Sequence, residues 1–215
     1  MVRSSMPGLR PWGVLMALLC LCSASGAAAA ETATSLAAEA RLECEAGRRA
    51  RDRDERKIRF ERGQALAQRA VGLDDANPEA HFSLFCNMGE LMRLDGESVS
   101  SAFGLRRLMA EVDRTLELNP HHSDALAAKG TLLVRLPRLL GGDAQLGEQM
   151  LRQAVRLDPN AFSSRLVLAR TCEARGERAE ALAFASRALQ VARDQGRADK
   201  IAEAQATLSE LRAGR

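Results

Sequence analysis

The sequence predicts an all-α fold, a right-handed solenoid of about four helical hairpins closed by a C-terminal capping helix. Three observations support this prediction. Pro78, Pro120 and Pro159 close successive segments at spacings of 42 and 39 residues, which is the range of stacked helical repeats. Apolar and small residues recur at helical spacing between these prolines. Glycine and proline are otherwise sparse and stand where helices should end.

The segment from Ser123 to Ala192 carries the pattern most clearly. In its second half, Gly176 separates two apolar helical patterns, as the turn of a helical hairpin would. Ala181 and Ala188 lie two turns apart on one face, so the backbones of neighbouring helices can approach closely. The unit before it repeats this arrangement, with Gly142 at the turn and Gly147 and Ala154 as the small pair.

The other predicted helices flank this segment. A charge-dense stretch at Ala50–Lys57 is expected to be a turn or a helix extension. A stack needs a final element that covers its last apolar face, and a helix that places Ile201, Ala204, Leu208 and Leu211 on one side would serve. The helices expected before the central segment are about Ser35–Asp52, Lys57–Leu73, Glu79–Arg93 and Leu105–Leu118.

The final unit resembles a tetratricopeptide repeat, with Gly176, Ala181 and Ala188 at the family's turn and small-residue positions. Two segments carry closer resemblances. The stretch EAHFSLFCNMGEL, followed by a long turn and DRTLELNP, is similar to the repeats of regulator-of-microtubule-dynamics-like proteins. The insertion RLPRLLGGD resembles the glycine-rich insertion of bacterial tetratricopeptide proteins associated with tripartite (TRAP) solute transporters. Together these resemblances span roughly Ser35–Ala192.

The chain also departs from the tetratricopeptide pattern. Lys129 and Arg165 stand where the repeat usually has apolar or aromatic groups, and Thr115 replaces a small alanine. After residue 30 the chain has no Trp or Tyr. Packing must therefore rest on Leu, Ala, Val, Met and a few Phe, which disfavours an aromatic-lined ligand pocket.

Composition and charge are those of a soluble globular chain. Of the residues, 46% are apolar and 27% charged, and the formal net charge is +3. Acidic residues are interleaved throughout, so the basic stripe of a nucleic-acid-binding protein is missing. Only three of the 31 basic residues are lysine. This arginine bias favours a bacterial, GC-rich source over a luminal eukaryotic repeat protein.

Residues 1–30 are expected to be a Sec signal peptide, which leaves residues 31–215 as the repeat domain. Arg3 and Arg10 form a basic start, Trp12–Cys22 is an apolar run of 11, and SGAAAA precedes the expected cleavage after Ala30. Eleven apolar residues are too few to span a bilayer as a helix. We therefore expect a periplasmic or secreted protein without a membrane span. A lipoprotein, modified at Cys20 or Cys22, is disfavoured because leucine precedes each cysteine.

Three cysteines remain after this cleavage. Cys172 occupies a buried repeat position and is expected to be a small core residue. Cys44 and Cys86 lie on the first helices of successive repeats, near the same repeat position. In an oxidising compartment they either form a disulfide or remain two buried thiols, and the sequence leaves both alternatives open.

Motifs for catalysis, cofactor binding or metal binding are missing, so we expect neither an enzyme nor a cofactor. His121 and His122 follow Pro120 and are predicted to be solvated turn residues rather than metal ligands. His81 is predicted to be a core residue with its hydrogen bonds satisfied. Asp143 is predicted to cap the next helix.

The resemblance to tetratricopeptide repeats implies a binding surface, because the first helix of each hairpin lines the concave side in that family. There, Arg135 and Arg170 would lie over an apolar floor, where guanidinium groups can bind a carboxylate or an extended acidic peptide. The alternative is that both arginines only solvate the surface. The positions carried over to this side are Phe82, Cys86, Ala127, Thr131, Val134, Arg135, Leu166, Arg170 and Glu173.

Leu139 and Leu140, in the insertion, form a second predicted contact site. They need cover from a neighbouring repeat or from a second copy of the chain, which would make a homo-oligomer. The function we expect is an exported, non-catalytic scaffold that binds a protein or peptide in its concave groove. The alternative is an accessory component of a TRAP-type transporter that docks a substrate-binding protein.

Overall fold

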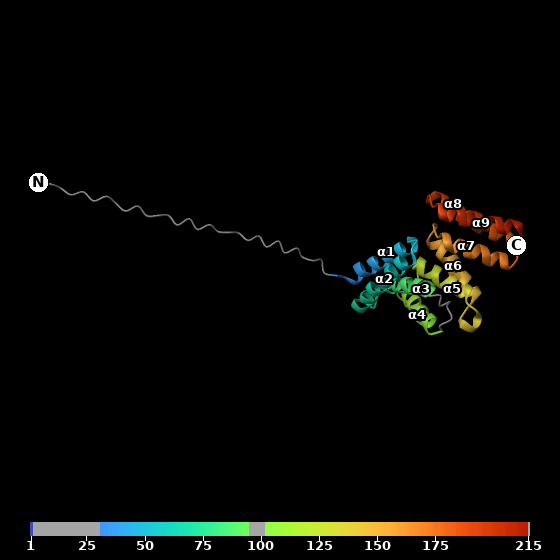
Figure 1. Ribbon diagram of the computed structural model, residues 1–215. Coiled ribbons are helices and arrows are strands. Elements are labelled where there is room, and N and C mark those ends of the chain that lie inside the picture. The colour runs from blue at the N-terminus through green and yellow to red at the C-terminus, as the bar shows by residue number, and fades with distance from the viewer. Residues whose placement is uncertain (2–30, 95–101, 215) are drawn as a thin grey trace. The chain divides into compact units, whose positions relative to one another are not determined.

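The structure is a computed structural model, and it describes residue 1, residues 31–94 and residues 102–214. The chain divides into two units, Met1–Ala30 and Glu31–Arg215. The expected signal peptide and most of the long turn after Leu94 lie outside the described residues. The described helices, labelled in Figure 1, are α1 (Ala33–Arg49), α2 (Arg53–Leu73), α3 (Pro78–Leu94), α4 (Ala102–Leu118), α5 (Ser123–Arg135), α6 (Ala144–Leu157), α7 (Phe162–Ala174), α8 (Arg178–Asp194) and α9 (Ala198–Ala213), with a 3-10 turn, η1 (Arg138–Leu140), before α6.

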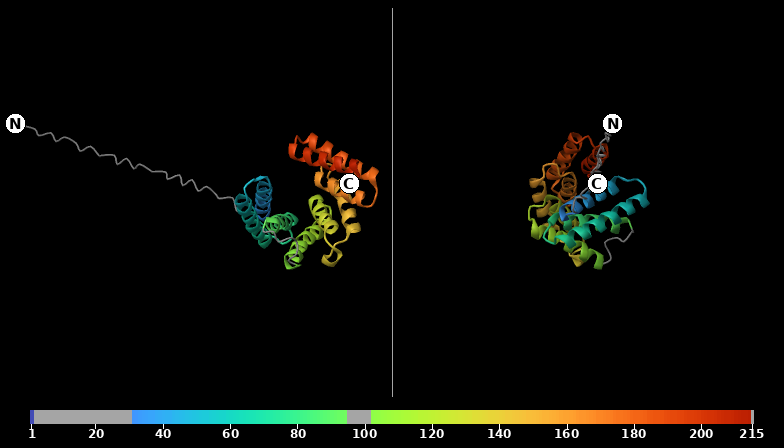
Figure 2. Two further views of the ribbon diagram at one scale, coloured as in Figure 1. Left: turned by 45° about the vertical axis from the view of Figure 1, so that its right-hand side comes forward. Right: turned by 90° about the vertical axis from the view of Figure 1, so that its left-hand side faces the viewer.

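Consecutive helices pair into four hairpins, which are α1–α2, α3–α4, α5–α6 and α7–α8. Each hairpin packs on the next in chain order, and the two views in Figure 2 follow this order from blue to red. The first helix of one hairpin also contacts the first helix of a neighbouring hairpin, as α1 does with α3 and α5 with α7. The predicted stack of four hairpins is therefore confirmed. We call the side formed by α1, α3, α5 and α7 the first-helix face.

The last helix closes the stack as predicted. Helix α9 packs on α8 and also contacts α7. Leu208 and Leu211 join Ala169 and Cys172 in one buried cluster, while Ile201 is half-buried at the edge of another. Without α9 this apolar surface would face water.

Helix ends follow local chemistry. Asp52 accepts a hydrogen bond from the backbone of Glu55 and caps α2, so the charge-dense stretch becomes the start of that helix. Asp143 accepts from the backbone of Leu146 and caps α6, as predicted. Gly176 has φ +79, the left-handed conformation that ends α7 at low cost.

Small residues set the closest helix contacts. A Cβ added to Gly130 of α5 would lie 2.7 Å from the backbone oxygen of Gly147 of α6, and the reverse also holds. A Cβ on Gly63 of α2 would lie 2.2 Å from the side-chain oxygen of Asn87 of α3. These contacts explain why the pattern needs glycine at helical positions where it is otherwise unfavourable.

Alanine and leucine dominate the buried core, with a few phenylalanines. Ala181, Ala185 and Ala188 are fully buried along α8, and Phe60 is the largest fully buried side chain. The sequence predicted such a core from the lack of Trp and Tyr. Among the described residues, no helix has both the length and the apolarity needed to cross a membrane.

The polar residues at packing positions find partners. Lys129 Nζ lies 2.6 Å from an Asp113 carboxylate oxygen. Arg165 is buried and donates to the backbone oxygen of Ala161 at 2.8 Å. His81 is buried as predicted, with its ring nitrogens 2.8 Å from Glu111 Oε2 and 3.0 Å from the Asp75 carbonyl oxygen.

The prediction for His122 was wrong. Its neighbour His121 is exposed, as expected, but His122 is only 8% exposed. Its Nδ1 accepts a hydrogen bond from the backbone of Ala125 and so caps α5. A histidine that follows proline in a turn can cap a helix as an aspartate does, and this use gave no separate signal in the sequence.

Candidate peptide-binding groove

The first-helix face has two halves that differ in how their charges are paired. The N-terminal half is built by α1, α3 and the start of α5. The C-terminal half is built by the ends of α5 and α7 together with the start of α6. The predicted contact residues are divided between these two halves.

In the N-terminal half, Phe82 is covered rather than offered to a ligand. It is 3% exposed. The guanidinium of Arg41 lies 4.8 Å above its ring, and the ring of His122 lies 4.6 Å away. Phe82 therefore supports this face from below, and a partner would contact the groups above it.

The charges above Phe82 are paired with one another. Arg41 forms an ion pair with Asp124 at 2.9 Å, and His122 Nε2 lies 3.0 Å from Glu79 Oε1. The hydrogen bond from His122 lowers the pKa of the Glu79 carboxyl, and the charge of Arg41 lowers it further. These interactions join α1, α3 and α5, so this half has a structural role.

In the C-terminal half, α5, α6 and α7 surround a hollow of about 800 Å³. Its apolar surface comes largely from alanine and valine, and three arginines surround it. Among the residues that line this hollow, Glu177 in the turn after α7 is the one acidic side chain. The residues that line this hollow, which we call the arginine hollow, are Val134, Arg135, Ala144, Gln145, Val167, Arg170, Thr171, Ala174, Arg175 and Glu177.

Its three arginines differ in how strongly they are held. Arg175 forms ion pairs with Glu148 and Glu177. Arg170 makes one long hydrogen bond of 3.4 Å, to the hydroxyl of Thr207 on α9. Arg135 is exposed and makes no hydrogen bond or ion pair with any residue that the structure describes. Two guanidinium groups therefore remain available to an anionic ligand.

The structure brings together only part of the predicted contact set. Arg135 and Arg170 line the same hollow, together with Val134 of α5. Thr131 and Ala127 are half-buried on α5, one and two turns before Arg135, and Leu166 is 2% exposed in the core. Sequence reasoning missed Val167, Thr171 and Arg175. Val167 follows directly after the predicted Leu166, and Thr171 directly after the predicted Arg170. Val167 and Thr171 are four residues apart, which puts them on one face of a helix, and this spacing could have identified them.

The insertion between α5 and α6 folds as a compact turn. Helix α5 ends at Arg135, with Leu136 as its C-cap directly before Pro137. Gly141 has φ +87, in the left-handed region that favours glycine. At Gly142 the reason for glycine is steric, because an added Cβ would lie 1.8 Å from the Leu136 backbone oxygen.

Within this turn, the two predicted contact leucines are exposed to different extents. Leu139 is 99% exposed and Leu140 is 39% exposed. No part of the described chain therefore covers Leu139, and the contact at this site stays a prediction.

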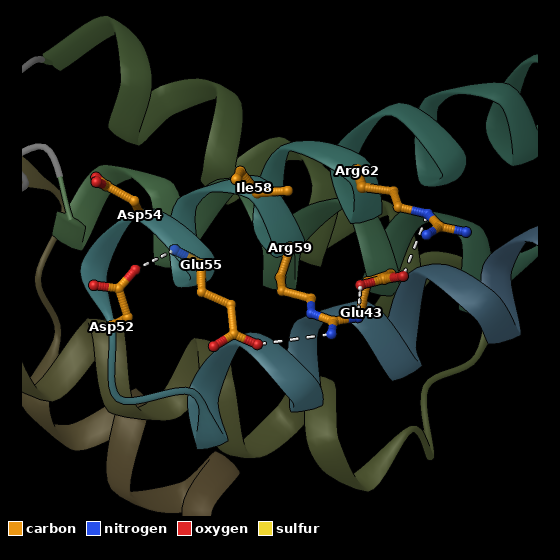
Figure 3. A pocket seen from close by; sticks show the side chains of 7 residues that line it. All are labelled: Glu43, Asp52, Asp54, Glu55, Ile58, Arg59 and Arg62. Atoms are coloured by element: carbon orange, nitrogen blue, oxygen red, sulfur yellow. Dashed lines mark hydrogen bonds and ion pairs between the residues drawn. The ribbon is translucent and has the colours of Figure 1, made fainter.

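A second hollow, of about 490 Å³, lies on α1 and α2. Figure 3 shows Arg59 and Arg62 pointing toward Glu43, and Glu55 pointing toward Arg59. Glu43 is contacted by both Arg59 and Arg62, at 3.3 Å each, and Arg59 also lies 3.7 Å from Glu55. Because both arginines of this hollow are already paired with carboxylates, it offers an anionic ligand less than the arginine hollow does.

One cluster has the composition of a metal site. Ligand atoms of Cys172, Glu177 and Glu180 lie within 4.8 Å of one another. Burial raises the pKa of the Cys172 thiol to about 11, so it keeps its proton at neutral pH. Arg152 and Arg175 engage the two carboxylates. The donor set is therefore a set of ion pairs beside a neutral thiol, which is a poor environment for a cation.

The remaining predicted pair is Cys44 and Cys86. Both are buried free thiols, on α1 and α3. Both belong to one buried core cluster, where α1 packs on α3. The disulfide stays a prediction.

Comparison with protein-family models and with curated proteins finds no match. The solved structures that are similar over most of this chain include the following three. The MamA RS-1 ArsTM double mutant is 15% identical with a TM-score of 0.47, over 81% of this chain and 95% of that one. A thermophilic TPR protein of Thermus thermophilus is 17% identical with a TM-score of 0.42, over 79% and 98%. YrrB, described as a TPR protein with an unusual peptide-binding site, is 15% identical with a TM-score of 0.38, over 80% and 91%.

Proposed function

We propose that this chain is an exported, non-catalytic scaffold that binds a protein partner through an extended acidic segment seated in the arginine hollow. The observation that carries this proposal is the pair of weakly engaged guanidinium groups, Arg135 and Arg170, beside an apolar floor. Arginines that only solvate the surface would not require an apolar hollow next to them.

The chemistry of the hollow defines the ligand. Guanidinium groups bind carboxylates through two parallel hydrogen bonds, and each charge-assisted bond contributes about 1.5–3 kcal/mol. Val134 and Val167 favour an apolar side chain next to the carboxylate. Glu177, at the rim, would repel a carboxylate placed there. The favoured ligand therefore alternates acidic and apolar residues, as an extended strand would present them.

A binding experiment tests the proposal. The probe is a fluorescein-labelled peptide of alternating leucine and glutamate, and its matched control replaces glutamate with glutamine. We expect binding of the acidic peptide only, weakened at least tenfold, or about 1.4 kcal/mol, in the double variant Arg135→Ala and Arg170→Ala. Arg156→Ala removes an exposed arginine of α6 outside the hollow and should leave binding unchanged. Equal binding of both peptides, or no effect of the double variant, would contradict the proposal.

Export is a separate part of the proposal and rests on the composition of residues 1–30. We expect the mature chain to begin at Glu31, which makes it periplasmic or secreted. The intact mass of the protein from periplasmic extract measures this directly. A diacylglyceryl group on Cys20 or Cys22 would instead make it a lipoprotein.

A second candidate function is that of an accessory to a TRAP-type transporter, docking its substrate-binding protein. The nearly complete exposure of Leu139 on the insertion favours this function, because an apolar side chain so placed suits a contact with another subunit. A symmetric oligomer with a central channel would support it. A monomer that binds the acidic peptide would favour the first candidate.

A further inference from the structure

Arg175, the third arginine of the arginine hollow, is held by two carboxylates that differ in burial. The side chain of Glu148, on α6, is only 10% exposed, and both of its oxygens contact the Arg175 guanidinium, one of them at 3.0 Å. Glu177 contacts the same guanidinium through one oxygen at 2.5 Å, and its side chain is 44% exposed. One partner of Arg175 is therefore fixed inside the protein, while the other lies at the surface.

The two carboxylates also differ in how readily Arg175 can part from them. A buried carboxylate that loses its cation is strongly destabilising, because its charge is left uncompensated. An ion pair at the surface contributes little, since water and salt can replace it. Arg152, one turn further along α6, also contacts Glu148, with 2.8 Å between Nε and Oε1, so this carboxylate is held in place. An incoming anion can therefore displace Glu177 from Arg175, but not Glu148.

The position of Glu177 is set by its backbone and not by a capping interaction. Gly176 takes the left-handed conformation, with φ +79, and the backbone nitrogen of Glu177 donates to the Cys172 carbonyl oxygen at 2.9 Å. Glu177 is the N-cap residue of α8, but its side chain makes no capping hydrogen bond. The carboxylate can therefore leave Arg175 without uncapping α8, and its substitution should not disturb the start of that helix.

Glu177 places a carboxylate of the protein itself at the arginine hollow. It lines the hollow together with Arg135, Arg170 and Arg175. The hydrogen bond from Arg175 holds the pKa of the Glu177 carboxyl below its ordinary value of 4.5, so the group is ionised at neutral pH. Glu177 thus offers Arg175 the same chemical group that an acidic ligand would offer to the other two arginines.

We propose that Glu177 is a built-in competitor for the ligand of the arginine hollow, and that Arg175 is the third ligand-binding arginine. This inference rests on the proposed function. A carboxylate of the acidic segment replaces Glu177 on Arg175, and the displaced side chain turns into water. Glu148 stays bound and keeps Arg175 at the hollow. Glu177 therefore lowers the affinity for every ligand that reaches Arg175.

The first experiment measures the dissociation constant of the fluorescein-labelled leucine–glutamate peptide by fluorescence anisotropy. Glu177→Gln removes the competing charge and keeps the size of the side chain, so the peptide should bind at least about threefold more tightly. Glu180→Gln is the matched control. It removes an equal charge three residues further along, from a side chain that does not line the hollow. Its affinity should stay within about 1.5-fold of the wild type, since exposed charges at a distance are screened.

A second experiment asks whether Glu177 acts through Arg175. Arg175→Ala should weaken binding of the acidic peptide, and adding Glu177→Gln to that variant should give no further change. A charge that only repelled the ligand through space would keep its effect without Arg175. Circular dichroism checks that each variant is folded. Arg175→Gln keeps an amide donor for Glu148 and provides the same comparison if the alanine variant is unfolded.

The outcomes separate this inference from the proposed function. If the wild type binds the peptide through Arg135 and Arg170, but Glu177→Gln binds no more tightly than Glu180→Gln, the inference alone fails. It also fails if the tighter binding of Glu177→Gln persists without Arg175. If neither the wild type nor Glu177→Gln binds the acidic peptide, the proposed function fails and this inference fails with it.

Discussion

The two halves of the first-helix face are built alike but use their charges differently. In the N-terminal half, Arg41 is paired with Asp124, while Arg48 and Arg93 both contact Glu90. In the C-terminal half, Arg170 reaches only a hydroxyl group, and Arg135 has no partner among the described residues. Both halves use the first helices of consecutive hairpins, and the C-terminal half adds the start of α6.

This difference shows that position in a repeat does not decide what a charged residue does. An arginine whose neighbouring hairpin supplies a carboxylate becomes part of the packing. An arginine whose neighbour supplies only alanine and valine keeps its hydrogen-bonding capacity for a ligand. If this interpretation is right, substitutions in the N-terminal half should alter stability, and those around the arginine hollow should alter binding.

The largest effect is expected from Phe82→Ala. The change removes a buried ring that supports Arg41 and His122, so the free energy of unfolding should fall by about 3–5 kcal/mol. Val134→Ala, in the half-buried wall of the arginine hollow, is the matched control and should cost about 1 kcal/mol. Urea denaturation measures both. Similar losses for the two variants would remove the distinction between the halves.

A smaller loss of stability is expected from Asn87→Ala. The Asn87 amide donates to the backbone oxygens of Ala40 and Ser83, and Gly63 leaves the space that it fills. Its removal takes away two buried hydrogen bonds and leaves a cavity between the helices, which together cost about 1–3 kcal/mol. Binding of the acidic peptide should be unchanged when the variant is folded. A stability equal to the wild type would show that α1 and α3 do not depend on this contact.

A pH-dependent effect is expected at Glu79. Because the folded-state pKa of Glu79 lies below its ordinary value of 4.5, its contribution to stability is present above that value. It is lost as pH falls through the folded-state pKa. The difference in unfolding free energy between wild type and Glu79→Gln should be greatest near neutral pH and vanish in acid. The carboxylate is half exposed, so the neutral-pH difference should stay below about 1 kcal/mol. A difference that grows in acid would contradict this account.

The smallest change in stability is expected when Leu139 and Leu140 are both replaced by serine. Leu139 contributes almost nothing to the core, so unfolding should shift by no more than about 0.5 kcal/mol. Association with a partner or a second copy should weaken, which light scattering after size-exclusion chromatography would detect. Loss of helical content would show instead that the two leucines belong to the core.

Much of the fold could be predicted from the sequence because its determinants are local. Helical periodicity, Gly176 at a left-handed turn and Asp143 at a helix start act within a few residues, so they are visible in the chain itself. The start of α4 was predicted less closely. The helix begins at Ala102, three residues before the predicted Leu105.

The candidate site was only partly predictable because it depends on which side chains meet across hairpins. Arg135 and Arg170 were identified through the resemblance to tetratricopeptide repeats. Whether these arginines find hydrogen-bond or ion-pair partners depends on the side chains of α6 and α9. The repeat pattern does not predict how those two helices meet the arginines. His122 illustrates the same limit, because its burial follows from the rings and charges that α1 and α3 bring to it.

The most direct test of the central claim is methyl NMR during titration with the acidic peptide. The claim is that ligand binds in the C-terminal half while the N-terminal half is structural. We predict shifts of the methyl signals of Val134 and Val167, which line the arginine hollow, with little change at Leu36 and Leu84 in the N-terminal core. Shifts centred on Leu36 and Leu84, with Val134 and Val167 unmoved, would contradict the account.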